Sequence, residues 1–298
     1  MEIVVFGAGS LGSLLGGLLE REHDVTLVGR DQHVRAIDER GLRISGTIEA
    51  TVRPAARFAP PEAADLAIVC VKSFDTAAAA TALADCDLDA CLSVQNGMGN
   101  ERILADQLDA PVLAGTCSYG AFRPSPGEVR CTGVGEVALG PRTGGSSALA
   151  DRVGAAFERA GIVTSVDEDM PARLWEKLAV NAGINATTAL ARIDNGSVLD
   201  GDAWSIASAA ARETAAVARL EGIDLPDSAA ERAVRTVAEA TAENTSSMQQ
   251  DVLADRRTEI DAINGFVVDR AGERGVEVPV NGTLTRLIRT WEIGRGVR

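Results

Sequence analysis

A glycine-rich turn near the start of the chain constrains the fold more than any other feature. The apolar run Ile3–Phe6 leads directly into residues 7–12, whose sequence is Gly-Ala-Gly-Ser-Leu-Gly, and helical spacing follows as far as Glu20. A second expected strand, Asp24–Val28, comes next. A strand, a tight turn, a helix and a second strand in this order favour a parallel sheet with helices packed on it.

The same turn has the composition of a phosphate-binding site. Its first glycine permits the tight turn, its second lets the backbone approach a pyrophosphate, and its third lets helix and strand pack closely. The N-terminus of the following helix offers free N–H groups and a partial positive charge. We therefore expect a dinucleotide to bind here, and the residues expected to bind it are Gly7, Ala8, Gly9, Ser10, Leu11 and Gly12.

The end of the second strand carries the residues that distinguish two dinucleotides. An acidic side chain at this position binds the ribose 2′-hydroxyl of NAD, whereas an arginine accommodates the 2′-phosphate of NADP. Arg30 follows this strand after Gly29, so the sequence favours NADPH. Asp31 comes one position later and keeps NADH as the alternative.

The character of the chain changes near residue 167. Residues 1–166 alternate apolar strands such as Leu66–Val71 with helical stretches, which is typical of a parallel sheet covered on both faces. Residues 167–298 carry helical periodicity only. The sequence thus predicts an α/β Rossmann-type N-terminal domain (1–166) that binds the dinucleotide and an all-α C-terminal domain (167–298) that binds substrate, with the active site in the cleft between them. The other expected strands and long helices are Ala90–Val94, Pro111–Phe122, Glu128–Leu139, Gly161–Val166, Arg173–Leu190, Ala203–Glu221, Asp227–Ala242 and Met248–Arg274.

The balance of charge excludes one class of function and draws attention to two residues. A net charge of −14 argues against nucleic-acid binding, which needs clustered lysine and arginine. Of the 29 basic residues only Lys72 and Lys177 are lysines. Abundant carboxylates with so little lysine fit a high-salt cytoplasm, and a genome rich in G and C would also favour arginine. Because lysine, unlike arginine, can release a proton when its pKa is lowered, both lysines are candidates for chemistry.

The sequence also bears on membrane association, secretion and metal binding. No run is long and pure enough to span a bilayer, and no secretory signal precedes the first strand, so we expect a cytoplasmic protein without a membrane partner. The five cysteines form no C-x-x-C pair and only two histidines are present. We therefore expect buried free thiols and no metal site. The sequence leaves a homodimer open.

A polar stripe is expected on the first helix of the second half. Lys177, Asn181 and Asn185 follow one another in steps of four residues, which places all three on one side of a helix. Apolar residues surround them in the sequence, so this side does not resemble an ordinary solvated face. The stripe indicates a small-molecule site in which a lysine and two carboxamides act together.

A second polar segment, Asn244–Met248, precedes another expected helix. Ser246 and Ser247 are each followed three residues later by a glutamine, so either serine fits a capping box. Glu259 comes further along among charged residues, and its surroundings in the sequence are those of a surface position.

Taken in order, these motifs resemble the ketopantoate 2-reductase family along the whole chain. The family combines a Rossmann domain with an α-helical domain and uses NADPH to reduce 2-dehydropantoate to (R)-pantoate, a step towards coenzyme A. The residues that carry the resemblance are the glycines of the turn, Arg30, Val71-Lys72-Ser73, Gln95-Asn96-Gly97, Trp175-Glu176-Lys177 with Asn181, and residues 246–251 and 258–266.

The resemblance implies a role for each residue of the site. Lys177 would be the general acid that protonates the ketone oxygen of the substrate as hydride arrives at C2, and Glu259 would bind the substrate hydroxyl and help to hold the lysine. Lys72 and Asn96 would lie on the cofactor side, near the nicotinamide and its ribose. The residues that would hold the carboxylate and hydroxyl of the substrate are Asn181, Asn185, Asn244 and Ser247.

Two alternatives remain beside this interpretation. A related dehydrogenase could act on another 2-keto acid or on a hydroxyacyl compound, because substrate choice depends on the shape of the pocket. A non-catalytic NADP-sensing regulator could use the same fold, and it would be favoured if Lys177 or Glu259 were absent. Both residues are present, which favours the enzyme.

Overall fold

The chain forms two compact units. The computed structural model describes the backbone of residues 1–298 and every side chain except that of Asp31. The first unit comprises Met1–Gln95 and Gly99–Met170, and the second comprises Asn96–Met98 and Pro171–Arg298. The expectation drawn from Asp31 concerns a side chain outside the described residues. Because each unit has an apolar core of its own, the two are described separately.

The first unit is built on an eight-stranded sheet with the order β12-β11-β8-β7-β6-β1-β2-β5. Strands β8 and β11 pair antiparallel, and every other pair in this sheet is parallel. The α/β fold predicted for this part of the chain is confirmed. The strands are β1 (Glu2–Phe6), β2 (Asp24–Val28), β5 (Ala55–Arg57), β6 (Ala63–Val69), β7 (Asp87–Ser93), β8 (Val112–Cys117), β11 (Val137–Pro141) and β12 (Thr164–Val166).

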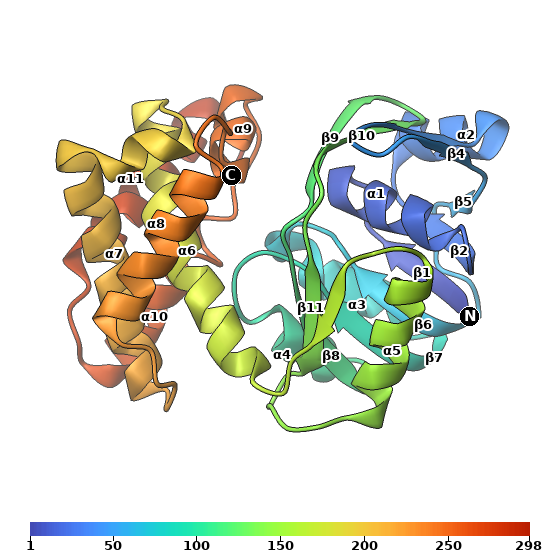
Figure 1. The fold of residues 1–298 in the computed structure, drawn as a ribbon, viewed down its shortest axis with the longest axis horizontal. Helices are drawn as coiled ribbons and strands as arrows, with labels where there is room; N and C mark the ends of the chain where they lie inside the picture. Colours follow the sequence, from blue (N-terminus) through green and yellow to red (C-terminus); the bar gives the residue numbers. More distant parts are fainter. The chain divides into compact units, whose positions relative to one another are not determined.

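Helices cover both faces of this sheet because its central strand is apolar on both sides. Ile3 and Val5 pack in the same core as α1 and α5, whereas Val4 packs in a separate core with α3 and α4. Figure 1 shows these helices around the sheet. The helices of the first unit are α1 (Ser10–Leu19), α2 (Asp31–Arg40), α3 (Thr76–Leu83), α4 (Asn100–Ala105) and α5 (Ala148–Arg159), with a short 3-10 helix η1 (Ser73–Asp75) before α3.

A second, four-stranded sheet corrects part of the sequence prediction. The two long segments expected as strands are each broken, so that β8 and β11 stay in the main sheet while β9 and β10 form a hairpin in the second sheet. At the break, the Ser118 N–H donates to the carbonyl of Glu136 at 3.0 Å, and a Cβ on Gly135 would lie only 2.4 Å from the Ser118 carbonyl carbon. This close approach lets both segments change sheets together. The second sheet has the order β4-β3-β10-β9 and consists of β3 (Leu42–Gly46), β4 (Ala50–Val52), β9 (Gly120–Ser125) and β10 (Glu128–Gly133).

The second unit is helical, as predicted. Its longest helix, α6, shares one apolar core with α7, α8, α10 and α11. Figure 1 shows this bundle in yellow to red. The helices are α6 (Met170–Ala191), α7 (Gly201–Leu220), α8 (Asp227–Ala240), α9 (Ser247–Leu253), α10 (Asn264–Arg274) and α11 (Pro279–Arg295), with a 3-10 helix η2 (Asn195–Leu199).

The prediction of one continuous helix over Met248–Arg274 is wrong. Helix α9 ends before Asp255, which has a left-handed φ of 48°. The carboxylate of Glu292 then accepts hydrogen bonds from both the N–H (2.8 Å) and the hydroxyl (2.7 Å) of Thr258. Because these bonds replace helical ones, residues 255–263 form a loop, and Glu259 lies in this loop rather than on a helix.

The cysteines are free thiols, as expected. Cys86, Cys91 and Cys131 are buried, and Cys70 and Cys117 are half-buried. Burial, with a smaller effect of Glu101, raises the pKa of Cys91 to about 12, so this thiol stays protonated at neutral pH. Within the part of the chain that the structure describes, no group of three His, Cys, Asp or Glu residues is arranged to hold a metal ion, and no helix has the length and hydropathy of a membrane span.

Candidate functional site

The turn between β1 and α1 is as tight as the glycine pattern predicts. Gly7 has a φ of 110°, and a Cβ on Gly12 would lie 2.1 Å from the Gly7 carbonyl oxygen. Gly9 differs, because the nearest atom to a Cβ there would be 4.0 Å away. Gly9 is also the N-cap of α1 and provides no side-chain hydrogen bond to the free N–H groups of the first turn. The turn is therefore closely packed at Gly7 and Gly12 and leaves open space at Gly9. This arrangement fits a pyrophosphate held by main-chain N–H groups.

Arg30 stands at the end of β2 as the N-cap residue of α2. Its side chain is 78% exposed, and its guanidinium lies 3.4 Å from a carboxylate oxygen of Asp75. An exposed ion pair of this length contributes little to stability, so Asp75 can give way to a stronger anion. The position and exposure of Arg30 fit a ligand phosphate.

The loops after β6 and β7 are joined by a polar network. The Gln95 amide donates to the carbonyl of Val71 at 3.0 Å and to the hydroxyl of Thr76 at 2.8 Å, and Thr76 in turn donates to Asn100. Lys72 lies within the first of these loops as the N-cap residue of η1. The network thus fixes the backbone on both sides of this half-buried lysine.

Asn96 belongs to a different unit from Gln95. Although it follows Gln95 directly, the segment Asn96–Met98 is part of the second unit. The Asn96 amide donates to Glu259 Oε2 at 3.4 Å, and the Met98 N–H donates to the carbonyl of Ala262 at 3.0 Å. The structure therefore brings Asn96 together with Glu259.

Helix α6 presents the predicted polar stripe. Lys177 and Asn181 are half-buried and Asn185 is 6% exposed, while the neighbouring apolar side chains of the helix are buried in the core. Asn264 of α10 donates to the carbonyl of Ala182 at 3.0 Å. The stripe therefore lies on a helix that is fixed by the core of the second unit.

The N-terminus of α9 adjoins the far end of this stripe. The Ser246 hydroxyl caps α9 by accepting the Gln249 N–H at 3.2 Å, and it lies 2.7 Å from the hydroxyl of Thr188, one turn beyond Asn185 on α6. Ser246 therefore has the capping role. Asn244 and Ser247, the two residues of this segment that are expected to bind substrate, are both exposed.

Glu259 is buried, contrary to its surface-like surroundings in the sequence. Its side chain is 5% exposed, in the loop between α9 and α10. Gly97 allows this loop to approach segment Asn96–Met98, because a Cβ on Gly97 would lie 2.5 Å from the Ala262 side chain.

The Glu259 loop, which we define as residues 255–263, is fixed by charges from the end of the chain. Asp261 accepts from Arg289 at 2.7 Å and from Arg298 at 2.8 Å, and Arg298 also donates to Glu292 at 2.6 Å. Burial raises the pKa of Asp261, but its bonds to the two arginines outweigh burial and hold that pKa below its usual value. Thr258 and Asp261, bound on either side of Glu259, thus hold it in place. No local sequence pattern predicts these long-range contacts.

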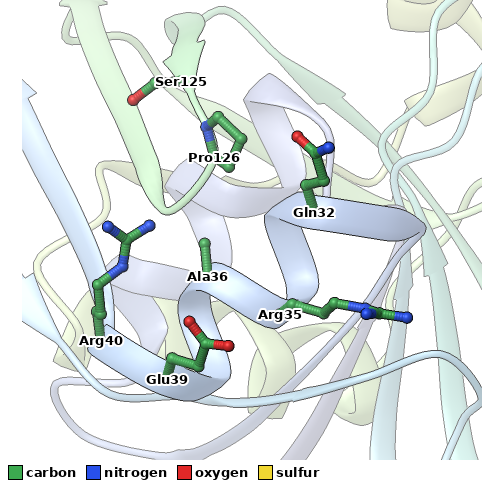
Figure 2. Close-up of a pocket in the computed structure, with 7 residues that line it drawn as sticks. All are labelled: Gln32, Arg35, Ala36, Glu39, Arg40, Ser125 and Pro126. Atoms are coloured by element: carbon green, nitrogen blue, oxygen red, sulfur yellow. The ribbon is translucent and has the colours of Figure 1, made fainter.

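A separate groove in the first unit involves none of the predicted residues. It has a volume of about 470 Å³ between α2 and the turn that joins β9 to β10. Figure 2 shows Arg35 and Arg40 pointing in different directions from α2, with the carboxylate of Glu39 beside Arg40. Because these cations do not converge, the groove lacks the donor arrangement of an anion site. Its lining residues are Gln32, Arg35, Ala36, Glu39, Arg40, Ser125 and Pro126.

Comparison with known proteins decides the family. The model described as ketopantoate reductase PanE/ApbA matches residues 3–144, and the model for the C-terminal part of the same family matches residues 169–292. The chain belongs to the ketopantoate reductase family. It is therefore an oxidoreductase, and the family uses NAD(P)H.

Individual relatives extend over nearly the whole chain. A 2-dehydropantoate 2-reductase of Halobacterium salinarum is 44% identical over 97% of this chain and 98% of its own length. The crystal structure of a PanE/ApbA family ketopantoate reductase from Ralstonia eutropha JMP134 has a TM-score of 0.92 at 34% identity, covering 99% of this chain and all of that one. A ternary structure of D-mandelate dehydrogenase with NADH and anilino(oxo)acetate has a TM-score of 0.93 at 25% identity and covers both chains fully. The fold is thus shared with dehydrogenases of different substrates.

Proposed function

We propose that the protein reduces 2-dehydropantoate to (R)-pantoate with NADPH, a step towards coenzyme A. The observation that carries the proposal is the stripe on α6, where Lys177, Asn181 and Asn185 lie among buried apolar side chains of the same helix. A 2-keto acid needs hydrogen-bond donors for its carboxylate and a proton donor for its ketone oxygen. The stripe supplies both kinds of group in one place.

Lys177 acts as the general acid in this proposal. When bound, the cofactor supplies the hydride that reduces the ketone carbon. Negative charge then develops on the ketone oxygen, and the Lys177 ammonium stabilises that charge and transfers a proton to it. Arginine could supply the charge but not the proton, which explains why a chain with only two lysines keeps one at this position.

The other polar groups orient the substrate. Asn181, Asn185, Asn244 and Ser247 offer amide and hydroxyl donors without a competing positive charge, so they can hold a carboxylate and a hydroxyl while Lys177 remains with the ketone. Glu259 accepts from the substrate hydroxyl and helps to hold the lysine. Its bond from Asn96 supports this role, because it orients one oxygen of the buried carboxylate.

NADPH is the proposed cofactor because of Arg30. Its guanidinium is exposed at the end of β2 and its partner Asp75 is weakly bound, so a 2′-phosphate can replace that carboxylate. Gly7–Gly12 and Lys72 complete the cofactor side of the site in this proposal. NADH remains the alternative, and the D-mandelate dehydrogenase structures, which hold NADH, make a direct comparison of the two cofactors necessary.

The test is a steady-state assay that varies the keto acid and the cofactor independently. We expect the highest kcat/KM with 2-dehydropantoate and NADPH, and a lower value with NADH. Phenylglyoxylate, the keto acid that corresponds to mandelate, serves as the competing substrate. A higher kcat/KM with phenylglyoxylate would contradict the proposed substrate, and absence of turnover with every keto acid despite cofactor binding would favour a regulator.

A further inference from the structure

Arg123, on β9, lies against the dinucleotide-binding turn although it belongs to the second sheet. Its Nη1 donates a hydrogen bond of 3.3 Å to the carbonyl oxygen of Ala8, the residue between the first two glycines of the turn. Strand β9 runs alongside α1, the helix that begins at this turn (Figure 1). The contact places a permanent positive charge beside the main-chain groups that would receive a pyrophosphate.

The Arg123 guanidinium is available to a ligand. Its side chain is exposed, and with the side chains that the structure describes it forms no ion pair. A guanidinium has several N–H donors, so a single bond to the neutral carbonyl of Ala8 leaves most of them for an anion. In a chain with 43 acidic residues and 29 basic ones, such a cation is conspicuous.

His33 holds β9 in place relative to the turn. The Gly127 N–H, in the turn between β9 and β10, donates to His33 Nδ1 at 3.0 Å, and His33 Nε2 lies 2.9 Å from the hydroxyl of Ser13 on α1. Since Nδ1 accepts, the neutral ring carries its proton on Nε2 and donates to Ser13. This buried bridge therefore connects the hairpin that carries Arg123 to α1 and to α2.

Arg123 is the charged group beside the bridge formed by His33, Ser13 and the Gly127 N–H. Burial, and next the charge of Arg123, lower the pKa of His33 to about 4, so the ring is neutral at physiological pH. The other two partners of the ring, Ser13 and the Gly127 N–H, are uncharged. Arg123 is thus a fixed cation close to the turn, and no second cation of this bridge competes with it for an anion.

We propose that Arg123 binds the pyrophosphate of the nicotinamide cofactor, together with the main-chain N–H groups of residues 7–12. Its contact with Ala8 places it at the turn itself, whereas Arg30 stands at the end of β2, where a 2′-phosphate is read. The two arginines therefore have different tasks: Arg123 recognises what NADPH and NADH share, and Arg30 recognises what distinguishes them. The inference rests on the proposed function because it requires a nicotinamide cofactor.

The experiment measures binding directly, in the absence of a keto acid. Dissociation constants of NADPH, NADH and ADP-ribose are determined by calorimetry at constant ionic strength for the wild type, Arg123→Gln, Arg123→Lys and Arg130→Gln. Arg130 is the matched control, because it is an exposed arginine on the adjacent strand β10. ADP-ribose carries the pyrophosphate but neither nicotinamide nor 2′-phosphate.

Arg123→Gln is expected to weaken all three ligands by a similar factor of about tenfold, the effect of one charge-assisted hydrogen bond. Arg123→Lys should lie between the wild type and Arg123→Gln, because lysine keeps the charge and loses the planar donor geometry. Arg130→Gln should bind all three ligands as the wild type does. Circular dichroism spectra verify that each variant is folded.

Three results would overturn the inference. Unchanged affinities in Arg123→Gln would show that this side chain does not bind the cofactor, and a loss confined to NADPH would assign it to the 2′-phosphate. An equal loss in Arg130→Gln would mean that only the overall charge of the sheet matters. A wild type that binds neither NADPH nor NADH would instead refute the proposed function, so the two failures are distinguishable.

Discussion

Two loops, one in each unit, are held in place by different kinds of contact. The turn of residues 7–12 is shaped by its own main chain, because a Cβ on Gly12 would meet the carbonyl oxygen of Gly7 at 2.1 Å. The Glu259 loop is held by side chains from far along the sequence, with Glu292 and Arg298 bonded to Thr258 and Asp261. The conformation of residues 7–12 can be predicted from a short sequence motif, whereas that of the Glu259 loop cannot.

The largest expected effect concerns chemistry in the second unit. Lys177→Ala should lower kcat by about 10²–10⁴-fold, because it removes the proposed general acid, and it should leave the dissociation constant of NADPH unchanged. Lys177→Arg should restore little of the activity, since arginine keeps the charge without releasing a proton. Near-normal turnover of Lys177→Ala would remove this residue from the mechanism.

The second-largest expected effect is a difference between substitutions at two glycines of the same turn, Gly12 and Gly9. Gly12→Ala should destabilise the first unit by about 3 kcal/mol, because its Cβ would meet main-chain atoms that cannot move away. Gly9→Ala should keep the stability of the wild type, because its Cβ enters open space. It should bind NADPH more weakly, because this Cβ would stand where the proposed pyrophosphate approaches the main chain. Urea unfolding and calorimetry measure the two effects, and equal stability of both variants would show that the turn is not closed as described.

A smaller loss of stability is expected in the Glu259 loop. Arg298→Ala should lower the free energy of unfolding by about 2 kcal/mol, because Glu292 is fully buried and loses a charged partner. Arg295→Ala is the matched control, since its ion pair with Asp255 is exposed and should contribute less than about 0.5 kcal/mol. If both variants unfold at the same urea concentration as the wild type, long-range charges do not hold this loop.

The smallest effect is a pH dependence in the first unit. The folded state keeps His33 neutral down to a pKa of about 4, whereas an unfolded histidine takes up a proton near its ordinary pKa of 6.5. The unfolded state therefore binds more protons between these values, so stability falls as the pH is lowered from 6.5 towards 4. His33→Gln should reduce this fall by about 1 kcal/mol, and urea unfolding at pH 7, 6 and 5 measures it. An identical pH profile in both proteins would show that His33 is not kept neutral by the fold.

The sequence predicted the features that depend on local patterns. The glycine-rich turn, the strands next to it and the stripe on α6 follow from spacings of a few residues, and the structure has the predicted elements in each case. The second sheet and the interruption after Asp255 were not predicted, because they depend on close contacts such as Gly135 with Ser118 and Glu292 with Thr258. The burial of Glu259 was missed for the same reason, since its charged neighbours in the sequence bind partners elsewhere in the fold.

The central claim is that the main chain of the first unit binds the cofactor while side chains of the second unit perform the chemistry. It is tested most directly by measuring the dissociation constant of NADPH, and kcat at saturating NADPH, for Gly9→Ala and Lys177→Ala side by side. We predict that Gly9→Ala binds NADPH weakly and recovers wild-type kcat at saturation, whereas Lys177→Ala binds NADPH normally and remains inactive. Loss of NADPH binding in Lys177→Ala, or a kcat of Gly9→Ala that saturating NADPH does not restore, would contradict the account.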